Sequence, residues 1–140
     1  MPISNSTEIK EFGILAIRGA NARDLLQGQI TINAANINNN NSVHGAICNN
    51  KGRVISSFIV SESLNRKDEI WLILYQDVLS KTEETLKKYS PFYKVELENL
   101  SNDWSFTALS RNDFNILTKK GPDTATSETS GHFIIESINN

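Results

Sequence analysis

Three residues with side-chain amides are close in sequence at the end of an expected short helix. They are Gln27, Gln29 and Asn33, and the packing of a helix does not account for them. Amides present hydrogen-bond donors and acceptors together, so the group could orient a flat heteroaromatic ligand. The plainer interpretation is that Gly28 caps the end of the helix. The residues alone leave both interpretations open.

A second candidate group lies at Asn49–Arg53, between two apolar runs. Asparagines followed by glycine favour a four-residue hairpin loop. Its backbone amides and the cations of Lys51 and Arg53 would suit the anionic tail of a ligand. The same two side chains are equally well explained as solvated surface charges.

The sequence does not support a site for nucleophilic catalysis or for metal binding. His44 and Cys48 are four residues apart on an expected strand, which puts them on one face but about 13 Å apart. We therefore expect no Cys–His pair, a surface position for His44 and a small core residue at Cys48. With one cysteine and two histidines, neither an internal disulfide nor a closed zinc site is expected. Phosphate-loop, dinucleotide, metalloprotease and nucleophile-elbow motifs are absent, so we predict no catalytic residue and no metal.

Composition limits the class of protein. The 140 residues carry 14 basic and 16 acidic side chains, a net charge of −2, without the basic stripe of a nucleic-acid or anionic-membrane binder. The longest apolar run, 70–75, is far shorter than the ~18 residues of a membrane span. The N-terminus lacks the apolar core of a signal peptide. We expect a soluble cytoplasmic chain with no direct nucleic-acid or membrane partner.

Hydrophobic patterning predicts an α+β chain. The expected strands are 12–18, 43–48, 53–61, 70–75, 92–97, 104–109 and 132–138, and the expected helices are 20–29, 77–89 and 111–117. Residues 36–41 and 119–131 are expected to be loops. Short connections between the strands favour an antiparallel sheet with flanking helices over a parallel βαβ array, with 43–75 as a three-stranded meander.

For two of these elements the sequence predicts burial and end points in detail. Strand 70–75 is apolar throughout and should be buried on both faces. Helix 77–89 should begin at Asp77 as N-cap and end before Pro91, with glutamates 83 and 84 paired to lysines 87 and 88. Its buried stripe should consist of Val78, Leu79, Thr82, Leu86 and Tyr89.

Three stretches of the sequence together follow the pattern of a known family. They are FGILAIRGANARDLLQGQITIN (12–33), HGAICNNKGRVISSFIV (44–60) and LKKYSPFYKVEL (86–97). In order and spacing, over about 11–110, they resemble the YgfZ family of folate-binding proteins. That family is related to the glycine-cleavage T-protein, an aminomethyltransferase. The resemblance implies the N-terminal part of this fold, with a first α+β domain at 1–100 and the start of a second at 101–140.

The resemblance also implies a function. It points to tetrahydrofolate as the bound small molecule and to support of iron–sulfur cluster assembly or repair, including clusters of tRNA-modifying enzymes. Iron–sulfur proteins are the implied partners. The candidate folate contacts are Gln27, Gln29, Asn33, Lys51, Arg53 and Ser57.

The chain departs from the family pattern in two ways. Ser57 stands where the T-protein has its catalytic aspartate, and a hydroxyl cannot take over the proton transfer of a carboxylate; His44 and Ser61 stand where it has two folate-side tyrosines. The YgfZ cysteine motif Lys-Gly-Cys is absent, so we expect a shortened gene product or an N-terminal fragment. Whether the chain is an enzyme stays open. An aminomethyltransferase and a remnant that binds only a protein partner are the alternatives to a weak folate-binding module.

Overall fold

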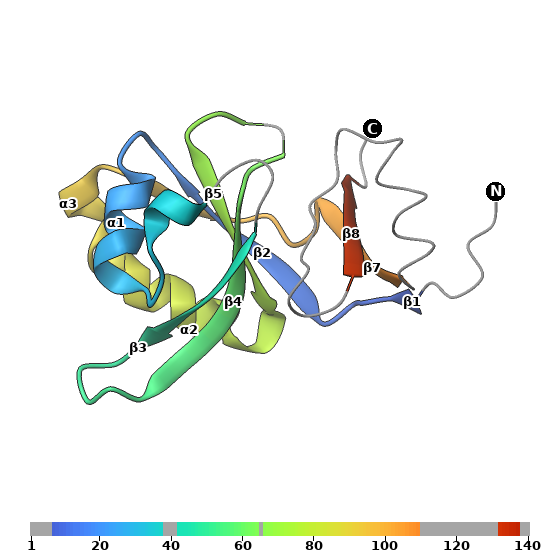
Figure 1. Cartoon of the computed structure of the whole chain (residues 1–140), viewed down its shortest axis with the longest axis horizontal. Coiled ribbons are helices and arrows are strands. Elements are labelled where there is room, and N and C mark those ends of the chain that lie inside the picture. The colour runs from blue at the N-terminus through green and yellow to red at the C-terminus, as the bar shows by residue number, and fades with distance from the viewer. Residues whose placement is uncertain (1–6, 38–41, 65, 110–131, 138–140) are drawn as a thin grey trace.

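The computed structural model describes residues 7–37, 42–64, 66–109 and 132–137, which form two antiparallel sheets (Figure 1). The larger sheet has the strand order β3-β4-β5-β2-β6 and the smaller one β1-β7-β8. The strands are β1 (Thr7–Glu8), β2 (Phe12–Arg18), β3 (Val43–Cys48), β4 (Val54–Glu62), β5 (Glu69–Tyr75), β6 (Glu96–Asn99), β7 (Trp104–Leu109) and β8 (His132–Ser137). The helices are α1 (Ala22–Gln29), α2 (Gln76–Lys87) and α3 (Ser90–Tyr93), with a 3₁₀ turn at Ala34–Asn36.

The centre of the larger sheet is β5, the apolar strand. It pairs antiparallel with β4 on one side and with β2 on the other. Residues 69–74 of β5 are buried on both faces, because helices cover one face and the smaller sheet covers part of the other. The predicted α+β class and the 43–75 meander are confirmed, and the last predicted strand is present as β8.

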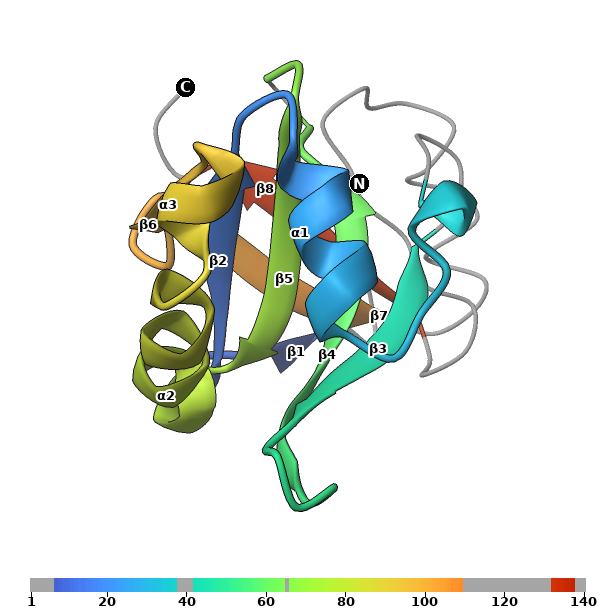
Figure 2. The same cartoon turned by 90° about the vertical axis from the view of Figure 1, so that its left-hand side faces the viewer.

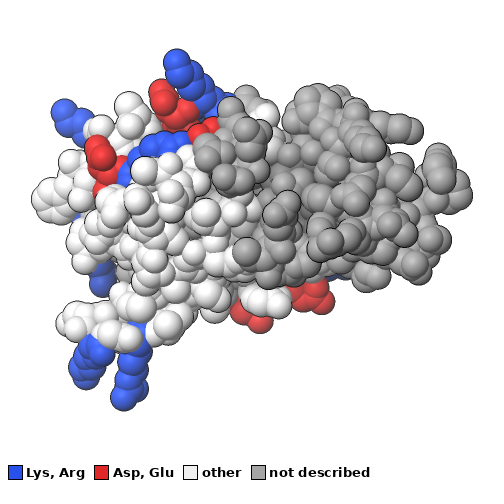
Figure 3. Space-filling view, in the orientation of Figure 1, with Lys and Arg blue, Asp and Glu red and all other residues white. Residues whose placement is uncertain are grey.

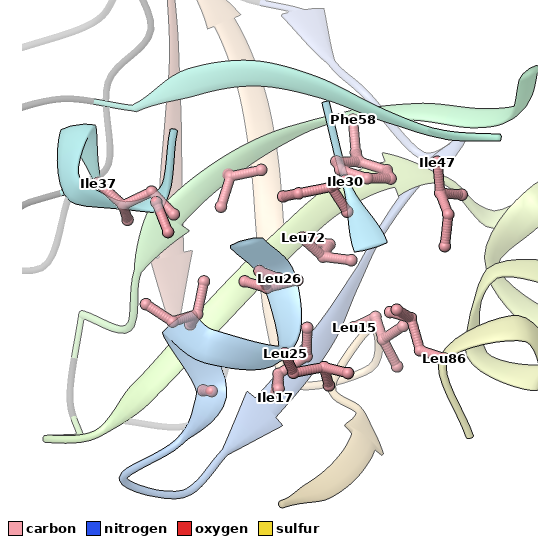
Figure 4. Close-up of a cluster of buried hydrophobic side chains, with 14 of the residues drawn as sticks. Leu15, Ile17, Leu25, Leu26, Ile30, Ile37, Ile47, Phe58, Leu72 and Leu86 are labelled. Carbon is pink, nitrogen blue, oxygen red and sulfur yellow. The ribbon is translucent and has the colours of Figure 1, made fainter. Parts of the chain in front are cut away.

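The two faces of this sheet carry separate cores. The helices lie together on one face (Figure 2), where Leu25 and Leu26 of α1 pack on Leu15 and Leu72 of the sheet (Figure 4). β1, β7 and β8 lie on the other side (Figure 1). There Trp71 meets Trp104 edge-on at 4.7 Å between ring centroids. Both tryptophans are buried core residues.

Helix α2 differs from its prediction at both ends. It begins at Gln76, Asp77 lies in its first turn, and Tyr75 occupies the N-cap without a side-chain hydrogen bond. The start is fixed instead by tertiary contacts, since Gln76 N donates to Glu11 O at 2.8 Å. Tyr89, predicted to be buried, is 37% exposed because α2 ends at Lys87.

The rest of the predicted stripe of α2 is inside. Leu79, Thr82 and Leu86 are buried and Val78 is half-buried. No ion pair within 4 Å joins the glutamates and lysines at 83–88, a stretch that the structure describes fully.

The prediction of a strand at 92–97 is wrong in its first half. Residues 90–93 form α3, with Pro91 in its first turn, where the fixed φ of proline suits a helix start. Lys94 then takes a left-handed φ of 56° and reverses the chain. The strand β6 begins only at Glu96, because it pairs with β2 from Arg18 back to Leu15.

Some predictions lie outside the described residues. These are most of the asparagine-rich loop (38–41), the helix at 111–117 and the loop at 119–131. The division into domains 1–100 and 101–140 stays a prediction. The structure pairs β1, from the first of these ranges, with β7, from the second. In the described part of the chain, none of the helices is long and apolar enough to cross a membrane.

Candidate functional site

A small cavity of about 180 Å³ opens on the face of the larger sheet that carries no helix. It lies where β5 ends and β2 begins, and both β3 and β4 contribute to its wall. The lining residues are Phe12, His44, Ser57, Phe58, Ile59, Ile73, Leu74 and Tyr75.

Strand register explains why these residues meet. His44 lies opposite Ile59, Ile59 opposite Ile73, and Tyr75 opposite Phe12. Residues directly opposite in an antiparallel pair share a face. The smaller sheet buries this face around Trp71, whereas His44, Ser57 and Tyr75 remain exposed. The cavity is therefore the uncovered end of an otherwise packed face.

The cavity combines aromatic walls with a few polar groups at its mouth. The rings of Phe12 and Tyr75 lie 5.0 Å apart at 56°, and Phe12 also meets Phe106 edge-on at 5.7 Å. The imidazole of His44 and the hydroxyl of Ser57 provide the polarity. None of the lining residues is acidic, so the cavity offers hydrogen bonds and a ring surface but no carboxylate for proton transfer.

Two of the three predicted amides, those of Gln27 and Asn33, have local structural roles. Gln27 Oε1 accepts from Ala34 N at 2.7 Å, and Asn33 Oδ1 accepts from Ala35 N at 3.0 Å. Both therefore satisfy backbone groups of the 3₁₀ turn. Gln29 is half-buried at the last position of α1, and Gly28 lies inside the helix, which is capped by Ile30. Helix α1 packs on the face opposite to the cavity (Figure 4).

The predicted hairpin at Asn49–Arg53 is present. Asn49 Oδ1 accepts from the backbone N–H groups of Lys51 and Arg53 at 2.9 and 3.0 Å, and Gly52 takes a φ of 80°. The side chains of Lys51 and Arg53 are exposed, and Figure 3 shows positive side chains projecting from this end of the molecule. The backbone N–H groups of Asn49, Lys51, Gly52 and Arg53 are thus already used within the hairpin.

Of the six predicted contact residues, the structure places Ser57 alone in the cavity. His44, singled out by its position in the family pattern, lines it too and is exposed as predicted. Ser61 is buried, and its hydroxyl has no hydrogen-bond partner in the described part of the chain. Cys48 is half-buried. Phe12 and Tyr75 were missed, because an apolar run gives no sign that one of its rings stays in solvent.

A larger cavity of about 360 Å³ lies between the turn after β2 and the turn between β4 and β5. Its walls are charged, and its acidic and basic side chains largely neutralise one another. Arg23 Nη2 binds Glu62 Oε1, and Arg23 Nη1 donates to Ala34 O at 2.8 Å. These contacts hold α1 against β4 and the 3₁₀ turn. We therefore assign the charged residues of this cavity a structural role.

Glu69 lies at the edge of this larger cavity, and its side chain is fully buried. Arg18 Nε donates to Glu69 Oε1 at 2.6 Å, and Trp71 Nε1 donates to Oε2 at 2.9 Å. Burial raises the pKa of Glu69, but hydrogen bonds from Trp71, Arg18 and Ser63 outweigh it and lower the pKa below its ordinary value. Glu69 therefore remains charged at neutral pH and holds β2 and β5 together. No group of three or more histidine, cysteine or acidic side chains in the described residues could hold a metal ion.

Sequence comparisons relate the chain to two groups of curated proteins. It is 30% identical over 109 residues to the tRNA-modifying protein YgfZ of Colwellia psychrerythraea, covering 78% of this chain and 32% of that protein. It is 28% identical over 102 residues to an aminomethyltransferase of Alkaliphilus metalliredigens, covering 73% of this chain and 27% of that protein. A YgfZ of Photobacterium profundum is 28% identical over 94 residues. No family model matches the chain.

The fold is also found in a solved structure. The glycine cleavage system aminomethyltransferase T from Bartonella henselae superposes with a TM-score of 0.63 at 14% sequence identity, covering 73% of this chain and 27% of that one. This likeness shows a shared aminomethyltransferase-like fold. The chain spans about a third of the length of the curated relatives that it matches.

Proposed function

Because the chain is a member of the YgfZ/T-protein-like family, we propose that it binds tetrahydrofolate at the cavity beside Ser57 and does not itself transfer an aminomethyl group. The observation that carries this proposal is the lining of the cavity. It has the aromatic walls and small polar mouth of a site for a flat cofactor ring, and it contains no acidic residue.

The absence of a carboxylate among the lining residues separates binding from catalysis. The alignment that places Ser57 at the T-protein aspartate agrees with its exposed position on the cavity wall. A hydroxyl can accept or donate a hydrogen bond to the folate amine but does not ionise near neutral pH. The aminomethyltransferase alternative would therefore need a proton-transfer group from elsewhere.

Lys51 and Arg53 remain candidates for the anionic end of the ligand. Arg53 immediately precedes β4 and is four residues before Ser57, at most about 13 Å along the extended chain. A ligand lying along β4 with its ring in the cavity would direct its carboxylates towards these cations. The amides of Gln27 and Asn33 already hold the 3₁₀ turn and lie with Gln29 on the helical side, so we do not place them in this binding mode.

We extend the proposal to the cellular role. Several relatives carry the name tRNA-modifying protein, and the family resemblance connects this with maintenance of iron–sulfur clusters. The proposed role is support of an iron–sulfur protein in the cytoplasm, with folate as the bound small molecule. Co-purification of this chain with an iron–sulfur enzyme of tRNA thiolation, lost when the cavity is filled, would support it.

Calorimetric titration with tetrahydrofolate tests the binding step. A cavity of about 180 Å³ is below the ~300–1,000 Å³ that encloses a drug-sized ligand, so we expect a dissociation constant in the high-micromolar to millimolar range. Ser57→Trp should abolish binding by filling the cavity. Ser80→Trp, on an exposed position of α2, is the matched control and should bind as the wild type does. Equal binding by both variants would place the site elsewhere.

A turnover assay tests the catalytic step. We expect no release of methylenetetrahydrofolate from an aminomethylated lipoyl carrier above background. Robust turnover that disappears in Ser57→Ala would establish the aminomethyltransferase alternative instead.

A further inference from the structure

Tyr75 is the unusual residue of the cavity wall. It is the last residue of the central strand, follows a run of fully buried side chains, and yet keeps 57% of its surface exposed. A large aromatic side chain at the edge of a hydrophobic core is normally buried, because its burial contributes strongly to stability. Here the phenol ring borders the cavity and turns one side to solvent.

The ring of Tyr75 is held in place by its neighbours. Phe12 packs against it at 5.0 Å and is itself fixed edge-on to Phe106 at 5.7 Å. The next residue, Gln76, anchors the backbone, since its side-chain amide donates to Phe12 O at 3.0 Å and to Lys10 O at 3.2 Å. These contacts restrict the ring on one side and the backbone next to it, which reduces the freedom that is lost on binding.

The size of the cavity decides how much of a ligand it can take. At about 180 Å³ it has room for one ring system rather than for a whole cofactor. The larger cavity near Glu69 has charged walls and no aromatic residue among those that line it. Within the described structure, the cavity beside Ser57 is therefore the better candidate for a flat ring.

We propose that Tyr75 is a stacking platform: one flat conjugated ring of the ligand lies against the exposed face of its phenol, beside His44 and Ser57. This inference rests on the proposed folate function and deepens it by naming the residue that recognises the ring. Two rings of a folate have the required chemistry, the pterin and the p-aminobenzoyl group. Stacking is tolerant of ring type, and the binding probes below separate the two.

The test compares Tyr75→Phe, which keeps the ring, with Tyr75→Leu, which removes it. The control is Tyr89→Leu, at a partly exposed tyrosine outside the cavity. Binding of 5-formyltetrahydrofolate, pterin, p-aminobenzoylglutamate and free glutamate is measured by calorimetry and by ultraviolet difference spectra. Circular dichroism melts confirm that each variant is folded. Stacking should reduce the absorbance of the bound ring.

Tyr75→Leu should weaken binding of the ring-containing probes by about 5- to 150-fold, the range found when alanine replaces a stacking aromatic. Tyr75→Phe should stay within about twofold of the wild type, Tyr89→Leu should be unchanged, and glutamate should not bind. The absorbance change should vanish in Tyr75→Leu alone.

The outcomes distinguish this inference from the function on which it rests. Folate binding that is equally tight in Tyr75→Leu would overturn the platform and leave folate binding intact. Binding of pterin or p-aminobenzoylglutamate through Tyr75, without binding of 5-formyltetrahydrofolate, would keep the platform and overturn the folate proposal. Failure of every ring-containing probe to bind the folded wild type would overturn both.

Discussion

Replacing Glu69 by glutamine removes a negative charge from the interior and should destabilise the protein strongly. The carboxylate is buried, and it accepts from Arg18 Nε at 2.6 Å and from Trp71 Nε1 at 2.9 Å. A glutamine can offer one oxygen to one of these donors. Its NH₂ group must then face the other donor, which loses its partner.

The structure allows the size of this effect to be bracketed. Removing one partner of a fully buried ion pair costs about 3–5 kcal/mol, and a single hydrogen bond to a charged group contributes about 1.5–3 kcal/mol. Arg18 is 26% exposed and keeps Glu98 at 2.9 Å, so it is not left as a buried, unpaired charge. We therefore expect Glu69→Gln to lower the free energy of unfolding by about 2–4 kcal/mol.

The effect should depend on pH in a definite direction. The pKa of Glu69 in the folded state lies below its ordinary value of 4.5. A lowered pKa means that the carboxylate stabilises the folded state above its unfolded pKa, and that this stabilisation is lost as the pH falls through the folded value. The difference between wild type and Glu69→Gln should be constant near neutrality and shrink below pH 4.5.

Urea unfolding followed by tryptophan fluorescence measures this difference, because Trp71 is one of the donors to Glu69. Glu98→Gln is the matched control. It loses a carboxylate from the same arginine, but Glu98 is 51% exposed and its removal should cost less than about 1 kcal/mol. Equal effects of the two variants at pH 7, or a difference that grows in acid, would refute the role given to the buried carboxylate.

Three further predictions test the packing around the sheet. Leu72→Ala, at a fully buried position of the central strand, should cost about 2–5 kcal/mol in urea melts, and a loss below 1 kcal/mol would contradict its placement. Gly13→Ala should destabilise by about 1–3 kcal/mol, since a Cβ there would collide with Ser101 Oγ; an unchanged melting temperature would show that Ser101 moves freely. Thr82 Oγ1 donates to Val78 O, so the Ser56 hydroxyl must donate to Thr82. Thr82→Val leaves the buried Ser56 hydroxyl without an acceptor and should lower the free energy of unfolding more than Ser56→Ala does. The reverse order would contradict this direction of the bond.

Sequence patterning predicted the elements whose pattern is local. The apolar run at 70–75 indicated a strand buried on both faces; residues 70–74 are buried in this way in the central strand β5, whereas Tyr75 at its end is exposed. Asparagine and glycine at 49–52 predicted a hairpin loop, and the Asn49 side chain closes it. These features depend on burial along one strand and on the backbone preferences of a few neighbouring residues, so they can be predicted without knowing the rest of the fold.

Boundaries that depend on distant partners could not be predicted in this way. Asp77 was the best N-cap by residue type, but bonds from Gln76 to residues 10–12 set the start of α2. Helix α2 does end before Pro91, but Pro91 lies in the first turn of a further helix, α3, and β6 is shifted to 96–99 by its register with β2.

The same distinction between local and distant contacts applies to the candidate site. Family motifs in the sequence identified Ser57 and His44 as residues of interest, and residue chemistry showed that Ser57 cannot replace a catalytic carboxylate. The tertiary structure decided which residues surround them. Pairing of β2 with β5 brings Phe12 beside Tyr75, 63 positions away in the chain, and the smaller sheet leaves this end of the face uncovered. Register and partial coverage of a sheet arise from contacts distant in sequence, so the exposed ring of Tyr75 is a property of the fold.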